Sequence, residues 1–150
     1  MDLQELTRLV GYLKSARPQQ RFEPDTPEAW LPVLKHITVE DARIMAPELV
    51  RAREWIGPSD IEAAVARLRA RRLEAAGVDR LWPNADPDRP VEYAAELRAV
   101  RGMVSSGRWG PDELEAYHRG EAGTLTGVEA FVTPARGELK RRKMPRALTG

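Results

Sequence analysis

The sequence predicts an all-α protein, and three observations support that prediction. Ala, Leu, Arg and Glu, which favour helices, dominate the chain of 150 residues. Clusters of Val, Ile, Thr and Tyr, which favour strands, are nearly absent. Apolar residues recur at spacings of three and four in several segments, as on one face of a helix. We therefore expect a small bundle of about four helices, then a linker, one or two further helices and a disordered basic tail.

Two helices are expected before residue 38. In DLQELTRLVGYLKSARP, residues 2–18, the leucines and Val10 share one face, and Pro18 ends the helix because the residue before a proline resists the α conformation. The second helix begins at Thr26-Pro27-Glu28, with an oxygen cap and a proline at the first helical position. Its apolar side consists of Trp30, Val33, Leu34 and Ile37.

The third and fourth helices each have a start signal. Thr38 is expected to cap the third helix, with an acid three residues on. Pro47 lies inside that helix, so we expect a break or bend near residues 45–46. The turn at residues 56–58 precedes Ser59 and Glu62, which are expected to form a capping box.

The composition of the chain changes after Gly77. VDRLWPNADPDRP, residues 78–90, holds three prolines and three aspartates and is typical of a linker. Residues 91–107 and 112–120 are predicted helices, and no periodicity follows Gly120. The expected organisation is a helical domain over 1–76, a linker over 77–90, a helical hairpin over 91–119 and a flexible basic tail over 120–150.

The charges are distributed unevenly although the net charge is only +1. Residues 1–76 carry 12 basic and 12 acidic side chains, and residues 77–135 carry 6 basic and 10 acidic ones. Residues 136–150 carry 6 basic side chains and 1 acidic one, which indicates a basic tail on a nearly neutral body. No apolar run approaches a membrane span, and the N-terminus is acidic where a signal peptide would be basic. We expect a cytoplasmic protein with no membrane partner.

No motif in the sequence indicates catalysis. There is no phosphate-binding loop, no dinucleotide fingerprint and no cysteine. His36 and His118 lie in different segments without a metal-ligand pattern around them. We expect neither an enzyme nor a cofactor or metal site.

Aromatic residues and the basic tail are the candidates for binding a partner, since tryptophan and tyrosine are enriched at binding hot spots. Trp30 is expected in the core and Trp55 packed against the start of the fourth helix. The candidate contacts lie in the second half of the chain; they are Trp82, Tyr93, Trp109, Lys140, Arg141, Arg142 and Lys143.

The arginine run in the fourth helix has two interpretations. Arg67, Arg69, Arg71 and Arg72 could contact phosphates, or they could form the solvated face of a helix. We favour the solvated face, because the surrounding region is neutral and recognition of nucleic acid usually needs a basic surface.

The order of signals in residues 1–73 resembles one known family. A leucine-rich helix stops at Arg17-Pro18 and is followed by RFEPDTPEAWLPVLKHITVEDA and then by WIGPSDI, a turn into a basic helix. This order is similar to the N-terminal domain of the phage loader-and-inhibitor proteins of the replicative helicase. The matching positions are Trp30, Leu34, Ala42, Pro58 and Ile61, which we expect to be framework residues. Pro47 departs from the family pattern, in which the third helix runs uninterrupted.

The resemblance implies a non-enzymatic adaptor with a folded helical N-terminal domain and a flexible C-terminal part. Such a protein binds the hexameric replicative helicase, holds it inactive and hands it to an initiator protein bound at the phage origin. In this chain the segment from Tyr93 through the tail is expected to contact the helicase. Two alternatives stay open: a small DNA-binding protein that uses residues 59–73 and the tail, and a structural or regulatory phage protein.

Overall fold

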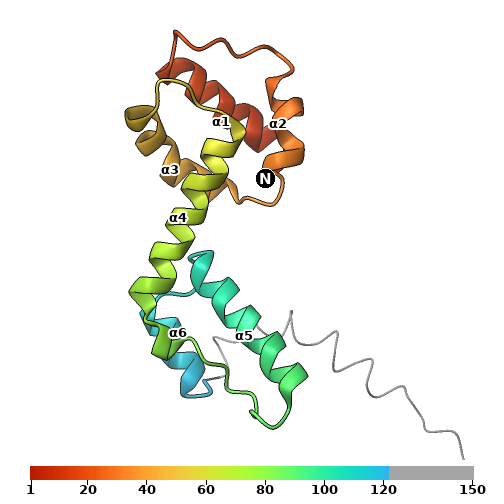
Figure 1. Cartoon of the computed structure of the whole chain (residues 1–150), viewed down its shortest axis with the longest axis vertical. Coiled ribbons are helices and arrows are strands. Elements are labelled where there is room, and N and C mark those ends of the chain that lie inside the picture. Colours follow the sequence, from red (N-terminus) through yellow and green to blue (C-terminus); the bar gives the residue numbers. More distant parts are fainter. Residues whose placement is uncertain (122–150) are drawn as a thin grey trace, which may run out of the picture. The chain divides into compact units, whose positions relative to one another are not determined.

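The computed structural model describes residues 1–121 and confirms the all-α class (Figure 1). This part of the chain contains no strand. The helices are α1 (Leu3–Ala16), α2 (Thr26–Leu34), α3 (Val39–Ala52), α4 (Pro58–Ala76), the 3₁₀ turn η1 (Val78–Arg80), α5 (Pro90–Ser105) and α6 (Pro111–His118). The expected flexible tail, including Lys140, Arg141, Arg142 and Lys143, lies outside the described residues apart from its first two positions.

Helix α1 forms as its apolar spacing predicts. Leu6, Leu9, Val10 and Leu13 are buried, and the helix ends at Ala16, two residues before Pro18. Its first turn is closed by Asp2 and Glu5, whose carboxylates accept each other's backbone N–H groups at 2.8 and 2.9 Å. This buried face packs against both α2 and α3 (Figure 1).

The first structural unit, residues Met1–Arg71, is built around that face. Leu34, Ala42 and Ile61 are at most 2 % exposed in its core. Trp30 is half-buried against the same core, with its ring edge-to-face on Phe22 at 5.9 Å. The other fully enclosed core residues of this unit are Leu6, Leu13, Ile37, Met45, Ile56, Ala64 and Val65.

Helix α3 continues through Pro47, so of the expected break or bend the structure excludes the break. Pro47 has no N–H to donate to the carbonyl of Arg43, one turn earlier. Both residues are exposed, so water can reach the carbonyl that loses its helical donor. The start of α3 is as predicted, because the Thr38 hydroxyl accepts the Asp41 N–H at 3.4 Å.

Two other helix starts differ from the expectation. Helix α2 begins at Thr26 itself and has no side-chain cap. Helix α4 begins at Pro58, and Asp60, rather than Ser59, provides its cap by accepting the Gly57 N–H at 2.9 Å. With Pro58 at the first helical position, α4 starts two residues earlier than expected, so the acid in the third helical position is Asp60 and not Glu62.

An ion pair links α3 to α4 inside the first unit. The Arg69 Nε donates to the Asp41 carboxylate at 2.9 Å, and Asp41 is only 1 % exposed. A carboxylate removed from water needs such partners, since an unpaired buried charge is strongly destabilising. Arg69 is therefore part of the framework of the first unit.

The second structural unit begins at Arg72, within α4, rather than after Ala76. Its core consists of Leu81, Ala99, Val100, Met103, Val104, Trp109, Leu114 and Tyr117, with Leu73 and Ala76 packed against it. Because Leu73 and Ala76, in the last turn of α4, pack against the second core, the division between the units lies inside the helix.

Residues 77–90 do not form the free linker that their prolines and aspartates suggest. Gly77, at φ 82°, ends α4 and leads into η1. Leu81 is then buried in the second core. None of the helices in residues 1–121 is long and apolar enough to cross a membrane.

The buried Asp41 generates a stability prediction. Replacing Arg69 by Ala should lower the free energy of unfolding by about 2 to 4 kcal/mol, because Asp41 loses a charged partner inside the core. Arg67→Ala is the matched control: Arg67 is 56 % exposed and lies 3.9 Å from Glu48, so its loss should cost about 0.5 kcal/mol or less. Urea unfolding of both variants measures the difference, and equal losses would show that the Asp41–Arg69 pair is not structural.

Candidate partner-binding surface

Trp82 is a large apolar side chain on the surface of the second unit. It is 50 % exposed, and its ring lies 4.8 Å from the ring of His118, tilted by 39°. The indole therefore lies against the last residue of α6 and still presents half of its surface to solvent. Trp82 therefore stays a candidate contact on the basis of its exposed area.

Hydrogen bonds between the loop and α6 fix the position of Trp82. The His118 Nε2 donates to the Arg80 carbonyl at 2.9 Å, because a carbonyl oxygen can only accept. On the other side of Trp82, the Asn84 side chain donates to the Tyr117 carbonyl at 2.7 Å. The Asn84 N–H also donates to the Tyr117 hydroxyl, at 2.7 Å. Residues 80–84 are thus bonded to the end of α6 on both sides of the tryptophan.

Tyr117 is the buried centre of this arrangement. It is 1 % exposed, and its hydroxyl donates to the Glu96 carboxylate of α5. Burial, reinforced by the bond to Glu96, raises the pKa of Tyr117 well above its usual value. The phenol therefore stays protonated and keeps donating to Glu96 while it accepts from Asn84.

Trp109 is not a surface residue, in contrast to the expectation. It is 5 % exposed, and its ring lies 5.2 Å from that of Tyr117. The chain reverses at Gly107, at φ 74°, and this turn brings Trp109 back onto the core. Tyr93 is half-buried on α5.

Trp55 also differs from its expected place, since it is 58 % exposed. The neighbouring Ile56 takes the core position, at 1 % exposed. Gln20 fixes Ile56 by accepting its N–H at 2.9 Å and donating to its carbonyl at 2.7 Å. Trp55 thus becomes an exposed tryptophan on the first unit.

The four arginines of α4 do not form one solvated face. Arg67 and Arg71 are more than half exposed, but both lie near Glu48 of α3, at 3.9 and 3.4 Å. Arg69 pairs with the buried Asp41.

Arg72 is engaged within the second unit. It donates to the Ser105 carbonyl at 2.9 Å, and a Cβ on Gly107 would meet its guanidinium at 2.9 Å. The structure therefore divides the run into two framework arginines and two surface arginines.

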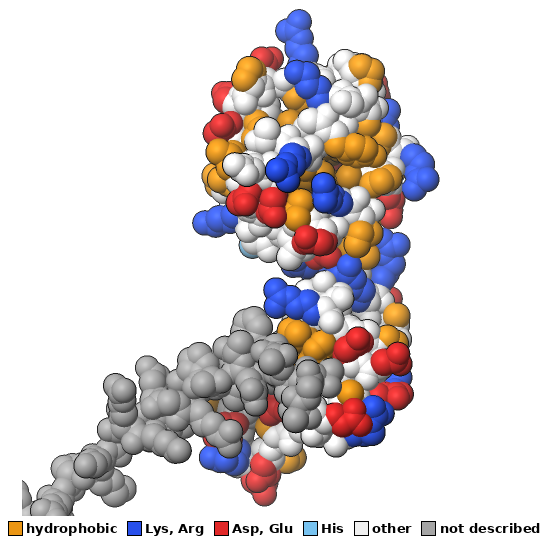
Figure 2. Space-filling view, turned by 180° about the vertical axis from the view of Figure 1, so that it is seen from behind, with side chains coloured by type: hydrophobic (Ala, Val, Ile, Leu, Met, Phe, Trp, Pro, Cys, Tyr) orange, Lys and Arg blue, Asp and Glu red, His pale blue; other side chains and the backbone are white. Residues whose placement is uncertain are grey.

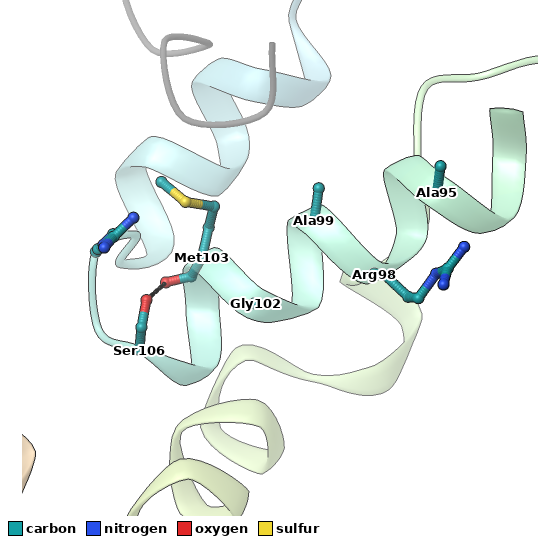
Figure 3. A pocket seen from close by; sticks show the side chains of 7 residues that line it. Ala95, Arg98, Ala99, Gly102, Met103 and Ser106 are labelled. Atoms are coloured by element: carbon teal, nitrogen blue, oxygen red, sulfur yellow. Dashed lines mark hydrogen bonds between the residues drawn. The ribbon is translucent and has the colours of Figure 1, made fainter. Parts of the chain in front are cut away.

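The structure contains a hollow along α5 that the sequence did not predict (Figure 3). It encloses about 500 Å³, and Ala95, Ala99 and Gly102 lie along it with Met103 and Ser106. Arg98 and Arg108 flank it. The spacing of the small residues, four and then three, was visible in the sequence, but small residues on a helix are too common to indicate a hollow.

The residues that the structure describes contain no group of His, Cys, Asp or Glu arranged to hold a metal ion. The polar side chains near Trp82 are bonded to one another, and they position a loop. This arrangement suits binding by shape and apolar area.

The contrast between the two tryptophans gives a second prediction. Trp109→Ala should destabilise the second unit by about 3 to 5 kcal/mol, since it removes a large side chain from a closed core. Trp82→Ala should cost less than about 1 kcal/mol, because half of the ring is already in water. Thermal unfolding followed by near-ultraviolet circular dichroism distinguishes them, and a larger loss for Trp82→Ala would contradict the assignment.

Comparison of the chain with protein-family models, with curated proteins and with solved structures returns no match.

Proposed function

We propose that the chain is a phage DNA-replication accessory protein that binds the hexameric replicative helicase and helps to load it at the origin. In this proposal the chain has no catalytic activity and acts in the host cytoplasm. The second unit contacts the helicase, and an origin-bound initiator protein receives the complex.

The positions of the family-like residues support this proposal. Leu34, Ala42 and Ile61 lie in the core of the first unit, and Trp30 packs against it. Pro58 begins α4. All five have framework positions, which is what the resemblance implies, and α3 runs uninterrupted as in the family pattern.

The presentation of Trp82 is the observation that most directly supports a protein partner. An exposed tryptophan on a loop bonded at both ends loses little conformational entropy when it is buried by a partner. Such rigid aromatic side chains dominate the binding energy of many interfaces. The α5 hollow gives the same unit a concave surface flanked by two arginines.

The proposal predicts a complex that depends on Trp82. Full-length protein mixed with the host's hexameric helicase should co-elute in size-exclusion chromatography with light scattering, with and without an ATP analogue. Trp82→Ala should weaken the complex by about 2 kcal/mol, roughly thirtyfold, through loss of the anchor side chain.

Trp55→Ala is the matched control, because Trp55 is similarly exposed but lies on the first unit. It should leave the helicase affinity unchanged. Absence of co-elution under every nucleotide condition would overturn the helicase assignment. If Trp82→Ala and Trp55→Ala lose helicase affinity equally, the role of Trp82 is overturned, but the helicase assignment is not.

A small DNA-binding protein is the second candidate, because Arg67 and Arg71 are exposed on the same helix. Under this alternative, DNA affinity should fall steeply between about 50 and 200 mM salt and be lost in Arg67→Ala/Arg71→Ala. Arg69 must stay unchanged in the test, since its loss removes a charged partner of the buried Asp41 and would destabilise the fold. A salt titration by fluorescence anisotropy measures both effects, and affinity unchanged by the double substitution would exclude α4 as the DNA contact.

A further inference from the structure

A groove on the first unit lies between α1 and α3, and none of its residues belongs to the surfaces used in the proposed function. It encloses about 290 Å³ and is lined by Arg8, Leu9, Tyr12, Arg43, Ala46 and Pro47. Leu9 and Ala46 are 4 % and 3 % exposed. They form the floor, while the residues at both edges are exposed.

The two edges of the groove have the same composition. Arg8 and Tyr12 lie one turn apart on α1, and Arg43 and Pro47 lie one turn apart on α3. Each edge therefore provides one guanidinium and one ring. Tyr12 is 45 % exposed, so its ring is available to an incoming side chain.

The arginines of the groove are not neutralised by their own unit. No carboxylate among residues 1–121 forms an ion pair with Arg8 or Arg43, in contrast to Arg67, Arg69 and Arg71. An apolar floor between two unpaired cations is complementary to a segment that carries apolar residues on one face and carboxylates beside them.

We propose that this groove binds an amphipathic helix of a protein partner that carries acidic residues on both sides of its apolar face. A helix fits because the groove runs between two helices and has a small residue, Ala46, in its floor. Such a groove accepts the side chains at positions i, i+3 or i+4 and i+7 of a partner helix. The carboxylates pair with Arg8 on one edge and Arg43 on the other.

Other occupants fit the groove less well. Residues 136–150 of this chain carry 6 basic side chains and 1 acidic one, so the arginines would repel them. Nucleic acid needs a basic face, whereas residues 1–76 are neutral overall. Figure 2 shows Lys and Arg interspersed with Asp and Glu over one face of the first unit.

This inference does not depend on the proposed function, because its residues belong to the other unit and its test contains no helicase. The probe is a synthetic helical peptide with Leu and Phe at i, i+3, i+4 and i+7 and Glu on both flanks. A second peptide has Lys in place of each Glu. Both are titrated into the ¹⁵N-labelled full chain and followed by NMR.

The Glu peptide should shift the backbone amides of Leu9, Tyr12 and Ala46, and the Lys peptide should bind at least about fivefold more weakly. R8E and R43E should each weaken the Glu peptide by at least about fivefold. The matched control is R21E, which reverses an exposed arginine outside the groove and should leave the affinity unchanged. Circular dichroism melting of the three variants checks that each is folded.

Four results would overturn the proposal. These are equal affinity for the two peptides, no shift at the groove amides, an equal effect of R21E, and displacement of the peptide by a tighter-binding single-stranded oligonucleotide. Concentration-dependent shifts of the same amides without peptide would instead assign the groove to a second copy of the chain.

Discussion

Helix α4 supplies apolar side chains to two separate cores, and this double role determines where the arginines of its run lie. Ile61, Ala64 and Val65 are buried in the first core, whereas Leu73 and Ala76 pack against the second. One helix that serves two cores has no single polar face along its length. The arginines of its run therefore have different partners. Arg69 and Arg72 are framework residues, whereas Arg67 and Arg71 stay on the surface near Glu48.

Local sequence was sufficient for the features that depend on one helix alone. The apolar face of α1 and the capped start of α3 at Thr38 follow from local spacing and local cap chemistry. The Asp41–Arg69 pair could not be predicted in this way, because its members lie on different helices and are brought together only by packing. The prediction of a break at Pro47 considered only the helical hydrogen bond that a proline removes. It did not consider that Pro47 is exposed on α3, where water can replace that bond.

The tryptophans show the same limit for the candidate site. Trp82 and Trp109 have similar turn-like surroundings in the sequence, yet one is half exposed and the other is closed into the core. The difference arises from the turn at Gly107 and from the bonds of Asn84 and His118 to distant positions. Trp55 is exposed because Gln20, far away in sequence, fixes Ile56 in the core instead.

A loader of the proposed kind has to hold one protein while it meets another. Two surfaces on separate units, the Trp82 loop and the groove between α1 and α3, would allow both contacts without competition for the same residues. The chemistry of the surfaces also differs: one presents a rigid aromatic ring, and the other presents two arginines over an apolar floor. Because the two surfaces differ chemically, a partner that fits one of them should bind the other poorly.

Hydrogen–deuterium exchange of the full chain, alone and with the hexameric helicase, tests whether a preformed Trp82 loop on the second unit makes the contact. If it does, residues 80–84 and 114–118 should gain protection in the complex, with α1 and α3 unchanged. Protection confined to α1, α2 and α3, with the loop exchanging as in the free protein, would contradict it.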